Sequence, residues 1–270
     1  SDLASLQTRA ELVDGEWVIH GQKIWTSNAH RADNMFCLAR TEPGVSKHAG
    51  ISYLLIDMKQ PGIEVRPLRQ ITGASHFNEV FFDGAKTPDS WIVGKRGEGW
   101  SVSRATLKHE RNSIGGAAQT SANLAAITEL AAASLVAGAP ALDDPEVRQR
   151  LVEIEGYVKS HLYSSYWQLT RESQGREAGM LPLLNKIIST NIGSDIARLG
   201  LDLVGDGGLA GPEARSAQWG KLGTSGADWV FQYMQSLGSA IAGGTANIQR
   251  NIVAERGLGL PRDAAASQKH

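Results

Sequence analysis

The sequence changes character near residue 94, and this change constrains the fold more than any other feature. Up to residue 93, short apolar runs alternate with turn residues, and beyond it long apolar stripes recur at helical spacing. The runs that predict strands lie at 17–20, 23–25, 34–40, 51–58, 63–68 and 78–83. Short strands separated by turn residues, such as the turn expected at His20-Gly21-Gln22, predict an antiparallel β-barrel or sandwich.

The remainder of the chain predicts an up-down four-helix bundle. Helices are expected over 97–135, 145–174, 182–204, 229–237 and 245–257. Asp144 followed by Pro145 is typical of a helix start. Long helices with one apolar stripe each pack into bundles. We therefore predict an α+β protein with a β domain over 1–93 and a helical domain over 94–270.

Composition argues against several functional classes. The 270 residues carry a formal net charge of −1, which provides no broad basic field for nucleic acid and no polybasic membrane surface. No uncharged run approaches the length of a membrane span. Cys37 is the only cysteine and falls in a strand-like run, so we expect a core residue in a reducing, cytoplasmic compartment. The seven histidines are scattered, so no metal site is expected.

Glu110 is a candidate catalytic base. It precedes Gly115-Gly116 by about one turn, inside a segment that otherwise predicts one helix. Each glycine in a helix interior costs about 1 kcal/mol relative to alanine, and close approach of a ligand or another backbone is a usual reason for such a pair. From spacing alone, a solvated Glu110–Arg111 pair on a helix packed through small residues remains an open alternative.

Three further segments suit a flat or anionic ligand, and each also has a simpler explanation. The glycine-rich stretch 205–211 either caps a helix or lets a phosphate or flavin approach; it does not match the dinucleotide-binding G-x-G-x-x-G pattern. Gly243-Gly244 runs into a helix whose free amides could bind an anion or carbonyl oxygen, unless Thr245 is an ordinary cap. Residues 23–28 either flank a flat polar heterocycle or hold a core tryptophan beside a polar turn.

The chain resembles the acyl-CoA dehydrogenases, flavoproteins that convert an acyl-CoA to a trans-2-enoyl-CoA. The resemblance rests on GQKIWTSNA at 21–29, FNEVFFD at 77–83 and IAGGTANIQRNIVAER at 241–256. With the helix that holds Glu110, it covers nearly the whole chain in order. The family fold has an N-terminal helical domain, a middle β domain and a C-terminal four-helix bundle, and this chain resembles the second and third. We expect it to be a fragment of a longer polypeptide, or to have a partner chain that supplies the first domain.

The resemblance implies an FAD site. Trp25, Thr26 and Ser27 match the segment that covers the isoalloxazine ring, with the Ser27 hydroxyl bonded to the flavin. The other positions implied to contact FAD are Ser1, Asp202, Gly205, Asp206, Thr245 and Asn247. The family usually has Gln at the position of Asp202. Many members also have an arginine that holds the FAD pyrophosphate where residues 131–140 have none, so we expect weak FAD binding.

The position of the base departs from the majority of the family. Most members carry the catalytic glutamate just before the Gly-Thr pair, where this chain has Gly243. A minority, including the isovaleryl and long-chain enzymes, carry it on the long helix, and Glu110 occupies that position. The resemblance thus implies Glu110 as general base and the Gly243 amide as donor to the thioester carbonyl. The residues implied to line the acyl and CoA channel are Ser1, Lys108, His109, Arg111 and Gly244.

These assignments predict FAD-dependent dehydrogenation of an acyl-CoA in fatty acid metabolism. The expected partners are an electron-transfer flavoprotein as acceptor and either further copies of the chain, in a dimer or homotetramer, or a homologue in a mixed tetramer. No nucleic acid or membrane partner is expected. Two alternatives remain: a non-catalytic, flavin-poor subunit of a mixed oligomer, and a flavin monooxygenase on the same fold. The chain by itself is expected to bind FAD poorly and to show little activity.

Overall fold

The computed structural model describes residues 2–114, 116–212 and 225–261, and gives the helical backbone alone for residues 107–114. The chain forms two compact units, Ser1–His109 and Glu110–His270. The long strands lie in the first unit and most of the helices lie in the second, as the change in sequence character predicts. The predicted mixed α+β class is therefore confirmed. The domain boundary at residues 93 and 94 stays a prediction.

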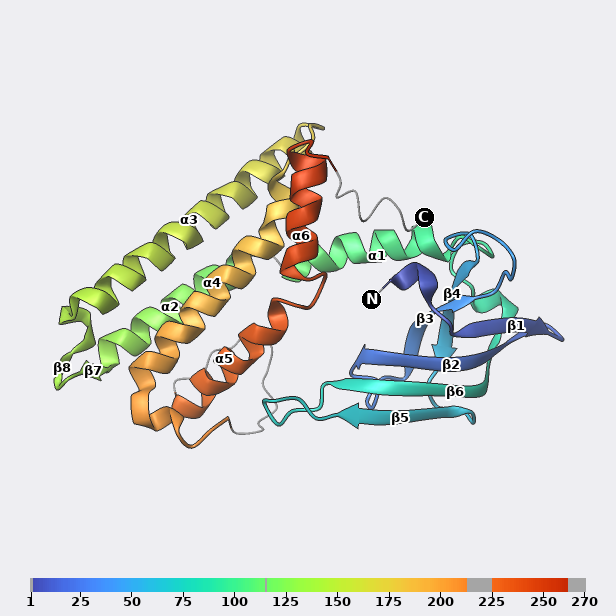
Figure 1. The fold of residues 1–270 in the computed structure, drawn as a ribbon, viewed down its shortest axis with the longest axis horizontal. Coiled ribbons are helices and arrows are strands. Elements are labelled where there is room, and N and C mark those ends of the chain that lie inside the picture. The colour runs from blue at the N-terminus through green and yellow to red at the C-terminus, as the bar shows by residue number, and fades with distance from the viewer. Residues whose placement is uncertain (1, 115, 213–224, 262–270) are drawn as a thin grey trace. The chain divides into compact units, whose positions relative to one another are not determined.

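The first unit is built on one six-stranded sheet. Its strands are β1 (Arg9–Val13), β2 (Glu16–Ser27), β3 (Asn34–Arg40), β4 (Ile51–Asp57), β5 (Ile63–Leu68) and β6 (Phe77–Pro88). The order across the sheet is β4-β3-β1-β2-β6-β5 (Figure 1). All neighbours are antiparallel except β1 and β3, which meet in parallel through Arg9 and Arg40. Alternate side chains, among them Trp17, Ile19, Leu54 and Val80, fill the core on one face.

Strand β2 corrects one expectation from the sequence. The predicted turn at His20-Gly21-Gln22 is wrong, because β2 continues through it and pairs with β6 on both sides. Gly21 has φ +135°, and a Cβ at this position would lie 2.8 Å from the Thr8 Cα atom. The glycine is therefore required by close approach of another backbone segment, and not by a turn. Strand β1, which the sequence analysis missed, follows directly on Thr8.

The second unit contains most of the helices. The helices of the described chain are α1 (Gly99–Ile114), α2 (Ala117–Ala133), α3 (Pro145–Ser173), α4 (Leu181–Val204), α5 (Gly226–Ser239) and α6 (Ala246–Ile252). The single helix expected over 97–135 is wrong: extended Gly116, with ψ 127°, is the N-cap of a separate helix, α2. The other helices are confirmed, and Asp144 caps α3 by accepting from the amides of Glu146 and Val147.

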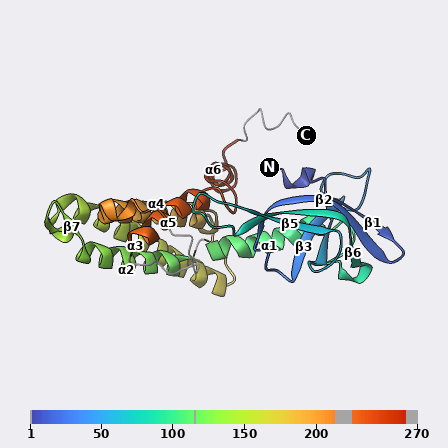
Figure 2. The same cartoon turned by 90° about the horizontal axis from the view of Figure 1, so that it is seen from below.

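Helices α2, α3, α4 and α5 run alongside one another in both views (Figure 1, Figure 2). Their shared core includes Ile127, Ile154, Ile196, Leu199 and Trp229. The short hairpin β7 (Leu135–Val136) and β8 (Ala139–Pro140) connects α2 towards α3. The bundle predicted from the apolar stripes is therefore confirmed.

A glycine on α4 sets how closely α5 approaches. A Cβ at Gly200 would lie 2.0 Å from Cε3 of the buried Trp229 ring, whereas a Cβ at Gly193 on the same helix would meet nothing within 4 Å. We expect Gly200→Ala to lower the free energy of unfolding by about 1–3 kcal/mol, because overpacking outweighs the gain in helix propensity.

The matched control is Gly193→Ala, which should raise the free energy of unfolding by about 0.5–1 kcal/mol. Urea unfolding followed by circular dichroism at 222 nm measures both. Equal stability of the two variants would show that the ring does not press on the α4 backbone.

Candidate functional site

The first group of predicted residues lies at the end of β2. Trp25 adopts φ +61° and is 63% exposed, and its indole is edge-on to Phe77, with ring centroids 6.0 Å apart. A register shift between Lys23 and Thr26 gives β2 one more residue than β6 and accommodates this conformation. Strained backbone of this kind costs about 1–3 kcal/mol and clusters at functional sites. The strand thus presents a flat aromatic surface to solvent.

Asn78 holds this segment from behind. Its side chain is fully buried, with Nδ2 donating to the Thr26 carbonyl (3.0 Å) and Oδ1 lying 3.1 Å from Nδ1 of His30. The amide of Asn28 donates to the His76 carbonyl (2.7 Å), which ties the next residues to β6, while Ser27 stays exposed. Asn78 is not among the residues predicted from the sequence, although it alternates with Val80 and Phe82 along β6, which marks it as a polar group facing the core.

The second group is the turn Gly243-Gly244. Both glycines have positive φ, +61° and +93°. The Gly243 carbonyl accepts from Nε2 of Gln249 (3.3 Å), and the Gly244 carbonyl accepts from Nζ of Lys186 (2.9 Å). The amide N–H groups of the two glycines have no acceptor among the described residues. Because its carbonyls are engaged and its amides are not, the turn presents hydrogen-bond donors.

Thr245 and Asn247 follow the turn at the start of α6. The Thr245 hydroxyl accepts from the Ile248 amide (3.3 Å), so it is the N-cap that the sequence allowed as the simpler explanation. Oδ1 of Asn247 accepts from Arg250 (3.2 Å). Both side-chain oxygens are therefore engaged locally.

The third group lies at the C-terminal end of α4. Gly205, with φ +49°, ends the helix, and Asp206 falls in the 3₁₀ turn that follows. Asp202 is exposed, and its carboxylate accepts from Nη1 of Arg150 (2.8 Å). Lys186, which contacts the Gly243-Gly244 turn, lies sixteen residues earlier, or about 24 Å along the helix at 1.5 Å per residue. The structure therefore does not bring the second and third groups together.

Five predicted positions fall outside what the structure describes. Ser1 lies outside the described residues. Lys108, His109, Glu110 and Arg111 lie on the backbone of α1, and their side chains are outside the described part of the chain. Their roles stay predictions.

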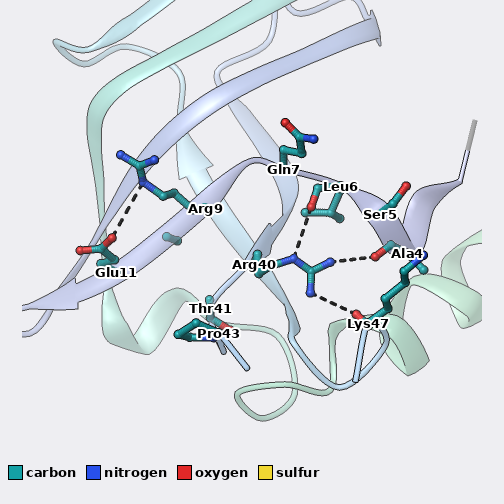
Figure 3. A pocket seen from close by; sticks show the side chains of 11 residues that line it. Ala4, Ser5, Leu6, Gln7, Arg9, Glu11, Arg40, Thr41, Pro43 and Lys47 are labelled. Carbon is teal, nitrogen blue, oxygen red and sulfur yellow. Dashed lines mark hydrogen bonds and ion pairs between the residues drawn. The ribbon is translucent and has the colours of Figure 1, made fainter. Parts of the chain in front are cut away.

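A pocket of about 570 Å³ lies in the first unit, near the N-terminal 3₁₀ turn Leu3–Ser5 (Figure 3). Its wall is held by Arg40, whose guanidinium donates to the carbonyls of Ala4 (2.7 Å), Leu6 (3.4 Å) and Lys47 (3.3 Å). None of the described site residues predicted from the sequence is among the eleven that line it.

Cys37 has no nucleophilic character in this environment. Its side chain is buried, and burial raises the pKa of the thiol to about 11, so it stays protonated at neutral pH. Among the described residues, no group of three His, Cys, Asp or Glu side chains is placed to hold a metal ion. Within the same residues, no helix has the length and apolar character needed to cross a membrane.

Comparison with known proteins identifies relatives along the whole chain. Two family profiles match: "Acyl-CoA dehydrogenase, middle domain" over residues 1–85 and "Acyl-CoA dehydrogenase, C-terminal domain" over residues 97–258. The acyl-CoA dehydrogenase IpdE1 of Mycobacterium tuberculosis is 40% identical over 266 residues, which is 98% of this chain and 65% of that protein. The chain thus spans about 65% of the length of the curated relative it matches.

Two solved structures are also similar. One is described as "Tcur3481-Tcur3483 steroid ACAD"; it is 27% identical with a TM-score of 0.83, and the match covers 97% of this chain and 65% of that one. The other is the ChsE4-ChsE5 complex from Mycobacterium tuberculosis, 24% identical with a TM-score of 0.80, and here the match covers 97% and 66%. At 24% identity the second shows a shared fold alone.

Replacing Asn78 tests how the exposed tryptophan segment is held. Asn78→Ala leaves the Thr26 carbonyl without its buried donor, so we expect the free energy of unfolding to fall by about 1–3 kcal/mol. Gln22→Ala, which removes an exposed hydrogen bond to Glu79 (3.2 Å) on the same pair of strands, is the control. It should change stability by less than about 0.5 kcal/mol. Equal melting temperatures for the two variants would contradict the role of Asn78.

Proposed function

We propose, from the premise that this chain belongs to the acyl-CoA dehydrogenase family, that the whole protein catalyses the FAD-dependent α,β-dehydrogenation of an acyl-CoA thioester. The observation that carries the proposal is the Gly243-Gly244 turn, whose carbonyls are engaged by buried donors while its amides have no acceptor among the described residues. Such a turn suits a ligand carbonyl whose oxygen gains negative charge during the reaction.

The residues around Trp25 fit a flavin ring. The indole is exposed and held in a strained conformation, and the neighbouring Ser27 is also exposed, so a flat heterocycle has both an aromatic surface and a hydroxyl to contact. We assign Trp25, Thr26 and Ser27 to this contact, with Thr245 and Asn247 as further FAD residues. Bound FAD would supply the two-electron acceptor for the hydride that leaves the β-carbon.

Asp202, Gly205 and Asp206 are assigned to FAD held by a partner subunit. Asp202 lies about 24 Å along α4 from the residue that contacts the Gly243-Gly244 turn, and Gly205 and Asp206 follow the end of that helix. One flavin ring does not span that distance. A second copy of the chain, or a homologue, therefore fits this part of the site better than the flavin of the same chain.

Glu110 is the proposed general base. It accepts the α-proton of the thioester, a role that works best when an apolar surrounding raises the carboxyl pKa. The Gly243 amide donates to the thioester carbonyl and stabilises the negative charge that develops as the proton leaves. Lys108, His109, Arg111, Ser1 and Gly244 are assigned to the acyl and CoA channel.

The relatives bear on the substrate and the assembly. A relative described as a steroid ACAD, 27% identical over 97% of the chain, favours polycyclic acyl-CoAs as candidate substrates alongside the fatty acyl-CoAs expected from the sequence. Its description names two polypeptides, which favours a mixed oligomer. The second candidate function is a flavin-poor subunit of such an oligomer, supported by the lack of arginine over 131–140. An electron-transfer flavoprotein as acceptor and a cytoplasmic location stay predictions.

Anaerobic titration of the whole protein with straight-chain, branched and steroid-derived acyl-CoAs, followed by flavin absorbance, tests the function. Glu110→Gln should slow flavin bleaching by about 10²–10⁴-fold, because the general base is lost, while flavin content stays unchanged. Glu129→Gln, on an exposed position of α2, is the control and should bleach at the wild-type rate.

Near-wild-type bleaching by Glu110→Gln would refute the assignment of the base. A wild-type protein that retains flavin but is bleached by none of the acyl-CoAs would favour the monooxygenase alternative. A protein that holds no flavin would favour the non-catalytic subunit.

A further inference from the structure

Lys186 is a charged residue on the buried face of α4. The residue is 2% exposed and lies at one edge of the buried face of α4, on the side that also carries Ala197 and Gly200. Nζ donates to the carbonyls of Ala240 (3.0 Å) and Gly244 (2.9 Å). Burial lowers the pKa of Lys186, and no carboxylate among the described residues forms an ion pair with it.

A buried ammonium without a counter-ion is unfavourable unless its N–H groups are hydrogen-bonded. A leucine or methionine at this buried position would avoid that penalty, so burial alone does not explain the lysine. What the lysine provides and an apolar side chain cannot is a pair of donors to the Ala240–Gly244 segment. The reason for Lys186 therefore lies in the segment that it holds.

The carbonyls of this segment are fixed from several sides. Ala240 accepts from Lys186 and from the Ala246 amide (3.1 Å), and Gln249, itself buried, donates to Gly243. Gly244 has φ +93°, a backbone conformation that other residues rarely adopt, so this position favours glycine.

In a planar trans peptide the C=O and N–H bonds point in opposite directions. The Gly243 carbonyl, bonded to Gln249, therefore sets the direction of the Gly244 amide. The Gly243 amide belongs to a peptide between the two carbonyls that Lys186 holds, so it turns only within a segment that is fixed at both ends.

We propose that Lys186 is a positioning residue, which sets the Gly243-Gly244 turn so that its amides face the thioester carbonyl of the substrate. The inference rests on the proposed function, in which the Gly243 amide polarises that carbonyl. Lys186 does not touch the substrate, and acts through the backbone carbonyls of Ala240 and Gly244.

Hydrogen–deuterium exchange of the whole flavin-loaded protein tests the structural part. Lys186→Met should speed exchange of the amides over 240–246 by about tenfold, because the local opening free energy falls, with exchange elsewhere unchanged. Lys186→Gln, which keeps a shorter donor, should fall between Lys186→Met and the wild type. Lys159→Met, which removes an exposed lysine paired with Glu155, is the control and should exchange like the wild type.

Turnover tests the catalytic part, with the acyl-CoA that bleaches the wild-type flavin fastest. Lys186→Met should lower kcat by about 10- to 100-fold, because a displaced donor loses contact with the charge that develops in the transition state. KM should stay within about threefold and flavin content unchanged, since the contact strengthens mainly in the transition state.

Unchanged exchange over 240–246 in both Lys186 variants would overturn the proposal. Faster exchange with wild-type kcat would also overturn it, because the turn would then have no part in the reaction. Loss of the folded state in both variants would make Lys186 a determinant of folding, which contradicts a local role. If the wild type oxidises none of the acyl-CoAs, the proposed function fails, and the exchange result alone decides whether Lys186 holds the turn.

Discussion

Helix α4 is the element on which the helical unit depends, because it packs against α2, α3, α5 and α6 at once. Its apolar stripe fills the bundle core, and Gly200 lets the ring of Trp229 lie against its backbone. Near its N-terminal end, the edge of its buried face carries Lys186, which contacts the Gly243-Gly244 turn. One helix therefore both organises the core and holds the turn that is proposed to face the substrate.

The two units hold their proposed ligand-binding segments in the same way. Each segment has residues at positive φ, Trp25 in the sheet and Gly243-Gly244 beside the bundle. Each is held by a buried polar side chain that donates to its carbonyls, Asn78 in one and Lys186 in the other. Strained backbone persists only where its surroundings over-determine it. Tethering the carbonyls from the protein side leaves the opposite side of each segment for a ligand, which is how a scaffold preorganises a site.

Local patterns predicted most of the fold. Apolar stripes located α3, α4 and α5, and alternation located β3 and β5, because periodicity follows from one element facing one core. The errors occurred where a distant segment decides. Gly21 indicates a turn when it is read in isolation, but it lies within β2. Glycine is needed there because the Thr8 backbone lies against it. The same limit applies to the site. Glycine pairs are visible locally, whereas Lys186 acts on residues 54 and 58 positions away, which no local pattern contains.

The departure at Asp202 is less disruptive than the sequence alone indicates. An isolated carboxylate where the family usually has glutamine would repel an anionic cofactor such as FAD. In the structure Arg150 donates a hydrogen bond to the Asp202 carboxylate (2.8 Å). The pair therefore carries no net charge, and in this it is like a neutral glutamine. The guanidinium also places donors at the end of α4, in a chain that has no arginine over 131–140. Because an arginine's planar fork suits phosphate as well as carboxylate, the pair retains the capacity to bind an anion that an isolated aspartate would lack.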